Sequence, residues 1–118
     1  MTGFIFVGLG GALGAMLRYS ISLVPYKNIF PLPTLIINII GALLIGYITG
    51  LAVKKNLSSD AVLFLKTGLC GGFTTFSTFS LEAYNLFQSG NYGYAALYIL
   101  LSVTGCVIGV WCGMLLAG

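Results

Sequence analysis

Four long apolar runs, separated by short polar segments, dominate the pattern of the chain. They cover residues of about 3–23, 34–53, 61–87 and 94–116. Each run supplies the roughly 20 apolar residues that a helix needs to cross the hydrocarbon core of a bilayer. Between the first two runs stand three prolines, which end one helix and start the next. The pattern therefore predicts an all-α membrane protein with four transmembrane helices in a single domain over residues 1–118.

The connections between the runs are short, so the predicted helices form an up-down-up-down bundle with both termini on one side. In that arrangement Lys54, Lys55 and Lys66 lie on one side of the membrane, and Arg18 and Lys27 on the other. The positive-inside rule needs a clear excess of Lys and Arg on one side, and three against two is nearly balanced. The count therefore permits insertion in both orientations and an antiparallel dimer. An oligomer is also expected because 118 residues are too few to enclose a wide pore alone.

The composition excludes a water-soluble domain. The chain is 58% hydrophobic and only 6% charged, with a mean hydropathy of +1.06, whereas a soluble domain carries about a quarter charged residues. The net charge of +3 comes from only five cations, so no basic patch for nucleic acid is predicted. The lipid bilayer is therefore the expected environment of the whole chain.

The three cysteines (Cys70, Cys106 and Cys112) lie in apolar runs without CxxC spacing, and the chain contains no histidine. This pattern gives little support to a metal-dependent or thiol-redox enzyme. Free cysteine commonly behaves as a small buried hydrophobe. We therefore predict a protein without enzymatic activity, whose cysteines pack among apolar side chains.

The third run contains the polar stretch "GGFTTFSTFS" (residues 71–80), with five hydroxyl side chains, three phenylalanines and two adjacent glycines. Two glycines followed by hydroxyl residues form a weak point in a helix. A break within a membrane frees backbone carbonyls, which are tolerated only where protein, a water-filled cavity or an ion satisfies them. The stretch therefore predicts a broken third helix that lines a path for a small, strongly hydrated anion.

Two phenylalanines of this stretch are suited to contact such an anion. Phe76 and Phe79 share one helical face at i, i+3 spacing, and Ser77 and Thr78 lie on its flanks. A phenylalanine ring has an electronegative face and an electropositive edge. Ring edges and hydroxyl hydrogens can therefore meet an anion in a narrow slot without holding it as tightly as a lysine would. The alternative is that both rings are ordinary core or lipid-facing side chains.

Other polar side chains within the runs are few, and each has two interpretations. Arg18 either extends its charged end to the membrane interface or attracts anions to a pore mouth. Asn38 offers two N–H donors, which either join helices or donate to a passing anion. On the fourth run, Tyr98 and Ser102 lie one turn apart. Tyr98 is either an interfacial aromatic or a hydroxyl donor within reach of Asn38.

Three segments give the chain a resemblance to a known family over essentially its whole length. They are "GGALGAMLRY" in the first run, "TLIINIIGALLIGY" in the second and "GLCGGFTTFSTFS" in the third. With these segments the chain resembles the Fluc (CrcB) family of fluoride channels. The resemblance implies a dual-topology homodimer of antiparallel subunits, with two separate pores along the subunit interface. It also implies passive export of F− across a bacterial plasma membrane, which relieves fluoride toxicity.

The same resemblance implies roles for individual residues. The residues of the fluoride pore that match the family's pattern are Arg18, Asn38, Phe76, Ser77, Thr78, Phe79, Tyr98 and Ser102. The backbone carbonyls of Gly71 and Thr74, two from each subunit, match those that hold a central structural Na+ at the dimer interface. Glu82 resembles an acidic residue near a pore end, and its role stays open.

A small proton-coupled multidrug exporter is the alternative function, because such a protein is also an antiparallel four-helix dimer of about this length. Proton exchange needs an ionisable carboxylate inside the membrane. The only acidic residues are Asp60, in a predicted loop, and Glu82, near a predicted helix end. The sequence therefore favours the fluoride channel. The partner in the dimer is either an identical chain or a paralogue.

Overall fold

The computed structural model describes residues 2–118, and all secondary structure in this range is helical. The elements are α1 (Thr2–Ser22), α2 (Leu32–Lys54), α3 (Ser59–Val62), the π-helix η1 (Leu63–Cys70), α4 (Gly71–Phe73), α5 (Phe76–Gln88) and α6 (Tyr92–Leu116). The predicted all-α class is confirmed for this range. Three helices, α1, α2 and α6, are long and apolar enough to cross a membrane.

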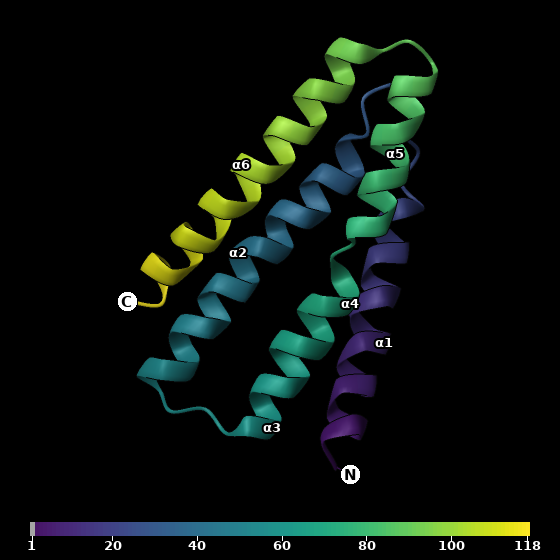
Figure 1. The fold of residues 1–118 in the computed structure, drawn as a ribbon. Helices are drawn as coiled ribbons and strands as arrows, with labels where there is room; N and C mark the ends of the chain where they lie inside the picture. The colour runs from purple at the N-terminus through teal and green to yellow at the C-terminus, as the bar shows by residue number, and fades with distance from the viewer. Residues whose placement is uncertain (1) are drawn as a thin grey trace.

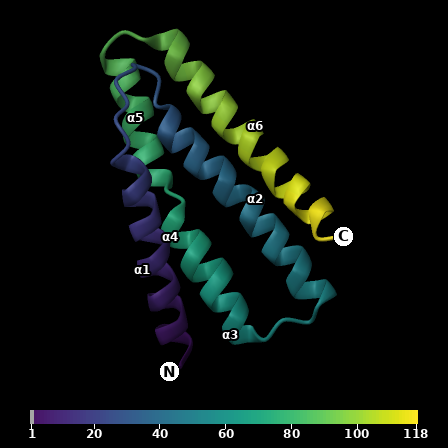
Figure 2. The same ribbon diagram turned by 180° about the vertical axis from the view of Figure 1, so that it is seen from behind.

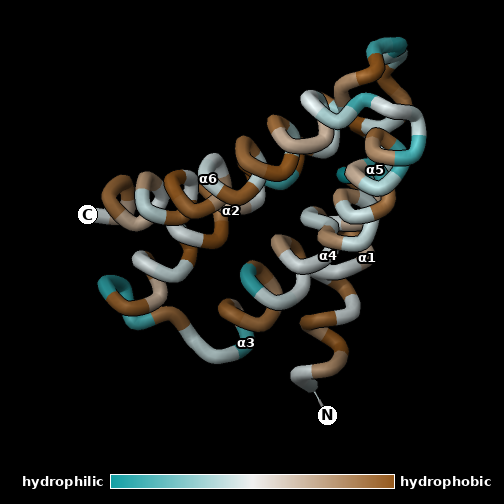
Figure 3. The backbone as a smooth tube through the Cα atoms, turned by 45° about the horizontal axis from the view of Figure 1, so that its top comes forward, coloured by the Kyte–Doolittle hydropathy of each residue, from teal (hydrophilic) through white to brown (hydrophobic). Residues whose placement is uncertain are grey.

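The chain runs along α1, returns along α2, runs back through α3 to α5 and returns again along α6 (Figure 1). Both views of the ribbon place α6 along α2, and α1 along the segment from η1 to α4 (Figures 1 and 2). The molecule is elongated, with extents of 48 × 28 × 22 Å. Coloured by hydropathy, α2 and α6 are hydrophobic over most of their length (Figure 3).

Local sequence signals account for the helix ends. Pro33 lies in the first turn of α2, where the N–H that proline lacks has no helical partner. After α2, Asn56 adopts a left-handed conformation (φ 53°), which asparagine tolerates better than most residues. The side chain of Ser58 then caps α3 by accepting a hydrogen bond of 3.2 Å from the amide of Ala61.

The π-helix η1 lies against α1 at a point where two backbones approach closely. A Cβ atom on Gly10 would lie 3.0 Å from the Cα of Gly68, and one on Gly68 would lie 2.9 Å from the Cα of Gly10. Both residues are buried. Small residues facing each other in this way allow helices to pack at short distance in a membrane. This contact fixes the position of the segment that leads into α4.

Much of the apolar surface of the single chain is uncovered. On α6 alone, Leu100, Val107 and Trp111 are each more than 60% exposed. Exposed apolar side chains carry little free-energy cost where lipid or another protein chain, and not water, surrounds the helix. The exposed apolar surface therefore agrees with the membrane-spanning length of the helices.

The contact between α2 and α6 gives a testable expectation. A Cβ on Gly113 of α6 would lie 2.7 Å from the backbone nitrogen of Tyr47 and closer still to the carbonyl oxygen of Leu43. We expect Gly113→Ala to lower the unfolding temperature in detergent, because overpacking destabilises by about 1–3 kcal/mol. Gly93→Ala on the same helix is the control, since nothing lies within 4 Å of its Cβ position.

For the control, alanine has the higher helix propensity, by roughly 0.5–1 kcal/mol, so Gly93→Ala should leave stability unchanged or raise it. Equal unfolding temperatures for the two variants would show that the α2–α6 backbone distance does not limit packing.

Candidate functional site

The backbone leaves helical geometry at two residues between α4 and α5. Thr74 has φ −87° and ψ 160°, and Thr75 has φ −152° and ψ 120°. The side chain of Asn38 on α2 holds this break with a reciprocal pair of hydrogen bonds. The amide of Thr75 donates to Asn38 Oδ1 over 2.9 Å, and Asn38 Nδ2 donates to the carbonyl of Thr75 over 3.1 Å. One of the two N–H bonds of the Asn38 amide is thus engaged, which leaves the other for a further acceptor.

The break changes the partners of several backbone groups. In a continuous α-helix the amide of residue i donates to the carbonyl of residue i−4. The amide of Thr75 donates to Asn38 instead of the carbonyl of Gly71. The amide of Thr78 donates to Thr75 Oγ1, over 3.2 Å, instead of the carbonyl of Thr74. Two carbonyls at the break, those of Gly71 and Thr74, therefore lack their regular helical donors.

Arg18 contacts the same break from α1. Its Nε donates to the carbonyl of Gly72 over 3.2 Å. The regular helical donor to that carbonyl would be the amide of Phe76, which lies beyond the break. The arginine side chain therefore satisfies a backbone acceptor within the bundle. This contact disagrees with the interpretation that Arg18 only extends to the membrane interface.

Two clefts adjoin the break. The smaller, here called the break cleft, has a volume of about 410 Å³ and opens on the surface of the single chain. Its lining includes six residues that the sequence analysis singled out: Asn38, Gly71, Thr74, Phe76, Phe79 and Ser102. No charged side chain lines it. The cleft is mostly apolar with a few neutral donors, which is the character expected for a path that an anion enters and leaves.

Within the break cleft, two side chains are left without the contacts usual for their type. The ring of Phe76 is 79% exposed, although it lies 5.6 Å from the ring of Phe79, measured between centroids. Ser102 is only 7% exposed, and its Oγ has no hydrogen-bond partner in the described chain. An unpaired buried hydroxyl is unfavourable unless another group accepts its hydrogen.

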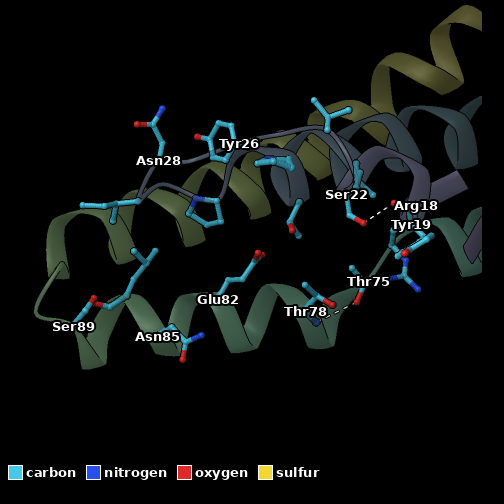
Figure 4. Close-up of a pocket in the computed structure, with 17 residues that line it drawn as sticks. Arg18, Tyr19, Ser22, Tyr26, Asn28, Thr75, Thr78, Glu82, Asn85 and Ser89 are labelled. Carbon is cyan, nitrogen blue, oxygen red and sulfur yellow. Dashed lines mark hydrogen bonds between the residues drawn. The ribbon is translucent and has the colours of Figure 1, made fainter. Parts of the chain in front are cut away.

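The larger cleft, here called the polar cleft, has a volume of about 670 Å³. Polar side chains from α1, the loop between α1 and α2, the break and α5 line it, among them Arg18, Tyr26, Thr75, Thr78, Glu82 and Asn85. Figure 4 shows Glu82 projecting from α5 into this space. Thr75 lines both clefts. The break therefore separates a polar compartment from a mostly apolar one.

Tyr98 on α6 is buried between residues of the two clefts and lines neither of them. Its relative exposure is 0%, and its ring lies 5.0 Å from that of Phe79 between centroids. Its hydroxyl donates to Glu82 Oε1 over 3.0 Å. Full burial disagrees with the interpretation of Tyr98 as an interfacial aromatic. The hydroxyl is directed to Glu82 and not to Asn38, so in this state its hydrogen is already engaged.

The predicted pore residues thus fall into distinct places. Asn38, Phe76, Phe79 and Ser102 share the break cleft, while Arg18 and Thr78 line the polar cleft. Ser77 is exposed on α5 and lines neither of these clefts.

Thr75 is one of the five hydroxyl residues of the stretch 71–80, and no separate role was predicted for it from the sequence. A threonine immediately before a helix is a frequent N-cap, and this signal points to the position that Thr75 occupies before α5. The expected location of Glu82 near a helix end also differs from its position in the middle of α5.

Comparison with known proteins gives concordant matches. The family model described as "CrcB-like protein, Camphor Resistance (CrcB)" matches residues 5–114. A relative from Ruminiclostridium cellulolyticum is 47% identical over 99% of this chain and 93% of its own length. A relative from Azobacteroides pseudotrichonymphae is 46% identical over 85% of this chain and 84% of its own length. One from Methanococcus maripaludis is 41% identical over 98% of this chain and 95% of its own length.

All three relatives carry the name "Fluoride-specific ion channel FluC". Together with three helices long and apolar enough to cross a bilayer, these matches identify a multi-pass membrane protein. A family match over residues 5–114 covers nearly the whole chain. The chain therefore belongs to the CrcB family.

Proposed function

We propose that this protein is a fluoride-selective ion channel. The observation that carries the proposal is the lining of the break cleft, where Asn38, Ser102 and the ring of Phe76 meet in a space without charged side chains. The names of the relatives support the same function. A channel name is not that of an exporter driven by protons, so the multidrug exporter is not favoured. Nor is it the name of an enzyme.

Fluoride holds its hydration water more tightly than the other halides, so a selective path must replace that water closely. The free N–H of Asn38 and the hydroxyl of Ser102 are neutral donors, and the edges of the phenylalanine rings are electropositive. Conduction also requires that each site bind weakly enough to release the ion. Neutral donors meet both conditions, since they compensate for lost water without a full opposite charge.

We further propose that two copies assemble as an antiparallel dimer with two pores along their interface. The break cleft is open at the surface of one chain, and Phe76 is 79% exposed there. A second copy covering the cleft would turn it into a closed path. In this arrangement the segment from α3 to α5 acts as a fourth membrane-spanning unit. The nearly balanced Lys and Arg counts permit both orientations, for an identical chain or a paralogue.

A structural Na+ at the centre of this dimer fits the residues of the break. No cluster of three or more His, Cys, Asp or Glu side chains that could bind a metal ion occurs among residues 2–118. Gly71 and Thr74 line the break cleft, and their carbonyls lack their regular helical donors. Carbonyl oxygens freed by a broken helix are suitable ligands for Na+. The ion would satisfy them and hold the two subunits together.

Fluoride and chloride efflux from liposomes tests the proposed function. Liposomes that contain the purified protein and are loaded with both salts should release F− rapidly, as measured with a fluoride electrode. Their release of Cl− should be slower by orders of magnitude. Release without added ATP or a proton gradient would agree with passive export down the fluoride gradient. Equal rates for the two halides, or no F− release beyond that of protein-free liposomes, would contradict the proposal.

A further inference from the structure

We infer that Asn38 and Thr75 are positioning residues for cation binding at the break. The carbonyls of Gly71 and Thr74 are here called the sodium cradle. Asn38 and Thr75 hold the two backbone amides that would otherwise close the cradle by helical hydrogen bonds. The inference rests on the proposed Na+ site and goes beyond it, because it assigns to pore-lining side chains the task of keeping that site open.

The first half of the cradle depends on Asn38. The amide of Thr75 is the regular helical donor to the carbonyl of Gly71, and it lies 2.9 Å from Asn38 Oδ1. The opposite bond, 3.1 Å from Asn38 Nδ2 to the carbonyl of Thr75, fixes the peptide on its other side. A reciprocal pair of hydrogen bonds of this kind restrains rotation of the Thr75 backbone. The Gly71 oxygen therefore keeps its lone pairs free.

The second half depends on the side chain of Thr75. The amide of Thr78 is the regular helical donor to the carbonyl of Thr74, and it donates to Thr75 Oγ1 over 3.2 Å. An N-cap hydroxyl competes with backbone carbonyls for the first amides of a helix. Removing the hydroxyl would leave the amide of Thr78 without this acceptor and allow it to turn to Thr74.

Two neighbouring carbonyls at the break have donors, which separates them from the cradle. The carbonyl of Cys70 accepts from the amide of Thr74 over 3.0 Å and from its hydroxyl over 2.9 Å. The carbonyl of Gly72 accepts from Arg18. The oxygens of Cys70 and Gly72 are therefore engaged, whereas the carbonyls of Gly71 and Thr74, two residues that line the break cleft, lack their helical donors. Surrounding residues that orient metal ligands in this manner commonly change metal affinity when replaced.

The test measures cation binding through stability and not through ion flux. Detergent-solubilised dimer is titrated with NaCl at constant ionic strength, with a large organic cation as replacement, and thermal unfolding is followed by the fluorescence of Trp111, the single tryptophan. A ligand that binds the folded state raises the unfolding temperature with increasing concentration. The readout is the apparent Kd for Na+, obtained by fitting the rise to its logarithmic dependence on one plus the ratio of the Na+ concentration to Kd. It is here called the Na+ midpoint, because half of the folded sites are occupied at that concentration. A purely structural defect lowers the temperature at every Na+ concentration without moving this midpoint.

We expect Asn38→Ala and Thr75→Val to raise the Na+ midpoint by about 10- to 100-fold, as replacements around metal ligands commonly do. Thr75→Ser keeps the hydroxyl acceptor and should retain a midpoint near that of the wild type. Gln88→Ala is the matched amide control, because Gln88 lies on α5 and donates only to the exposed hydroxyl of Tyr84. Its midpoint should not change.

The possible failures are distinguishable. Wild-type protein without any Na+ dependence would overturn the sodium cradle itself, and the positioning role with it. Clear Na+ dependence in the wild type with an unchanged midpoint in Asn38→Ala would overturn only the positioning role. Should Asn38→Ala fail to fold, the pair Thr75→Val and Thr75→Ser decides, since equal midpoints in these two variants would overturn it as well.

Discussion

Replacing Phe76 with isoleucine is expected to lower fluoride flux roughly tenfold, which corresponds to the loss of an aromatic contact of about 1–1.5 kcal/mol. Isoleucine keeps much of the apolar volume but has no electropositive ring edge. The single chain should fold as before, because the ring of Phe76 is 79% exposed and contributes little to its core. The measurements are F− efflux from liposomes and the unfolding temperature of the same preparation.

Phe4→Ile is the matched control for this variant. Phe4 is 81% exposed on α1, far along the chain from the break. The same change of side chain there should leave F− efflux at the wild-type rate. If Phe76→Ile also conducted at that rate with an intact dimer, the ring of Phe76 would be a packing element only. If both variants lost flux, the effect would come from the surface and not from a pore contact.

The apolar runs of the sequence predicted the long helices because length and hydropathy alone decide whether a segment can cross a membrane. The runs near residues 3–23, 34–53 and 94–116 correspond to α1, α2 and α6. The π-helix η1 was not predicted. Its residues (Leu63–Cys70) have no local sequence signal that separates i→i+5 from i→i+4 bonding. Its environment includes the contact of Gly68 with Gly10, which only the tertiary structure provides.

The residue types of the site were predictable from the sequence, but their contacts with one another were less so. Polar side chains are rare in the apolar runs, so Asn38 and Ser102 could be selected one by one. Phe76 could be selected by its place among the hydroxyl residues of the stretch 71–80. The hydrogen-bond partners of the site residues could not be predicted in this way. The bonds of Asn38 join residues 37 positions apart in the chain, and the bond of Tyr98 to Glu82 joins two helices. Such pairings depend on how the helices are placed side by side, and a single sequence does not record this.

The break links the proposed cation site to the proposed anion path. Asn38 lines the break cleft and holds the peptide of Thr75, and Thr75 in turn lines both clefts. A change in the backbone at this point would therefore alter the cradle carbonyls and the donors of the pore together. In this arrangement a bound Na+ would stabilise the conducting geometry as well as the dimer.

The hydroxyl of Ser102 offers a way to separate conduction from stability. It is buried and has no hydrogen-bond partner in the described chain, and an unpaired buried polar group destabilises by about 1–3 kcal/mol. Ser102→Ala should therefore leave the unfolding temperature unchanged or raise it. Fluoride efflux should fall roughly 10- to 100-fold, because a hydrogen bond to a charged group contributes about 1.5–3 kcal/mol. Stability and flux would then move in opposite directions, which loss of a packing contact does not produce.

Thr104→Ala on the same helix is the control for the loss of a hydroxyl. The hydroxyl of Thr104 is exposed and donates to the carbonyl of Leu100, so it has no free hydrogen for an anion. Its removal should leave efflux at the wild-type rate, and Ser102→Thr should restore efflux by returning the donor. Wild-type efflux in Ser102→Ala would show that the anion does not pass this hydroxyl. A fall in unfolding temperature together with the fall in flux would instead assign Ser102 to the packing of α6, because removal of an unpaired buried hydroxyl that makes no packing contact should not lower stability.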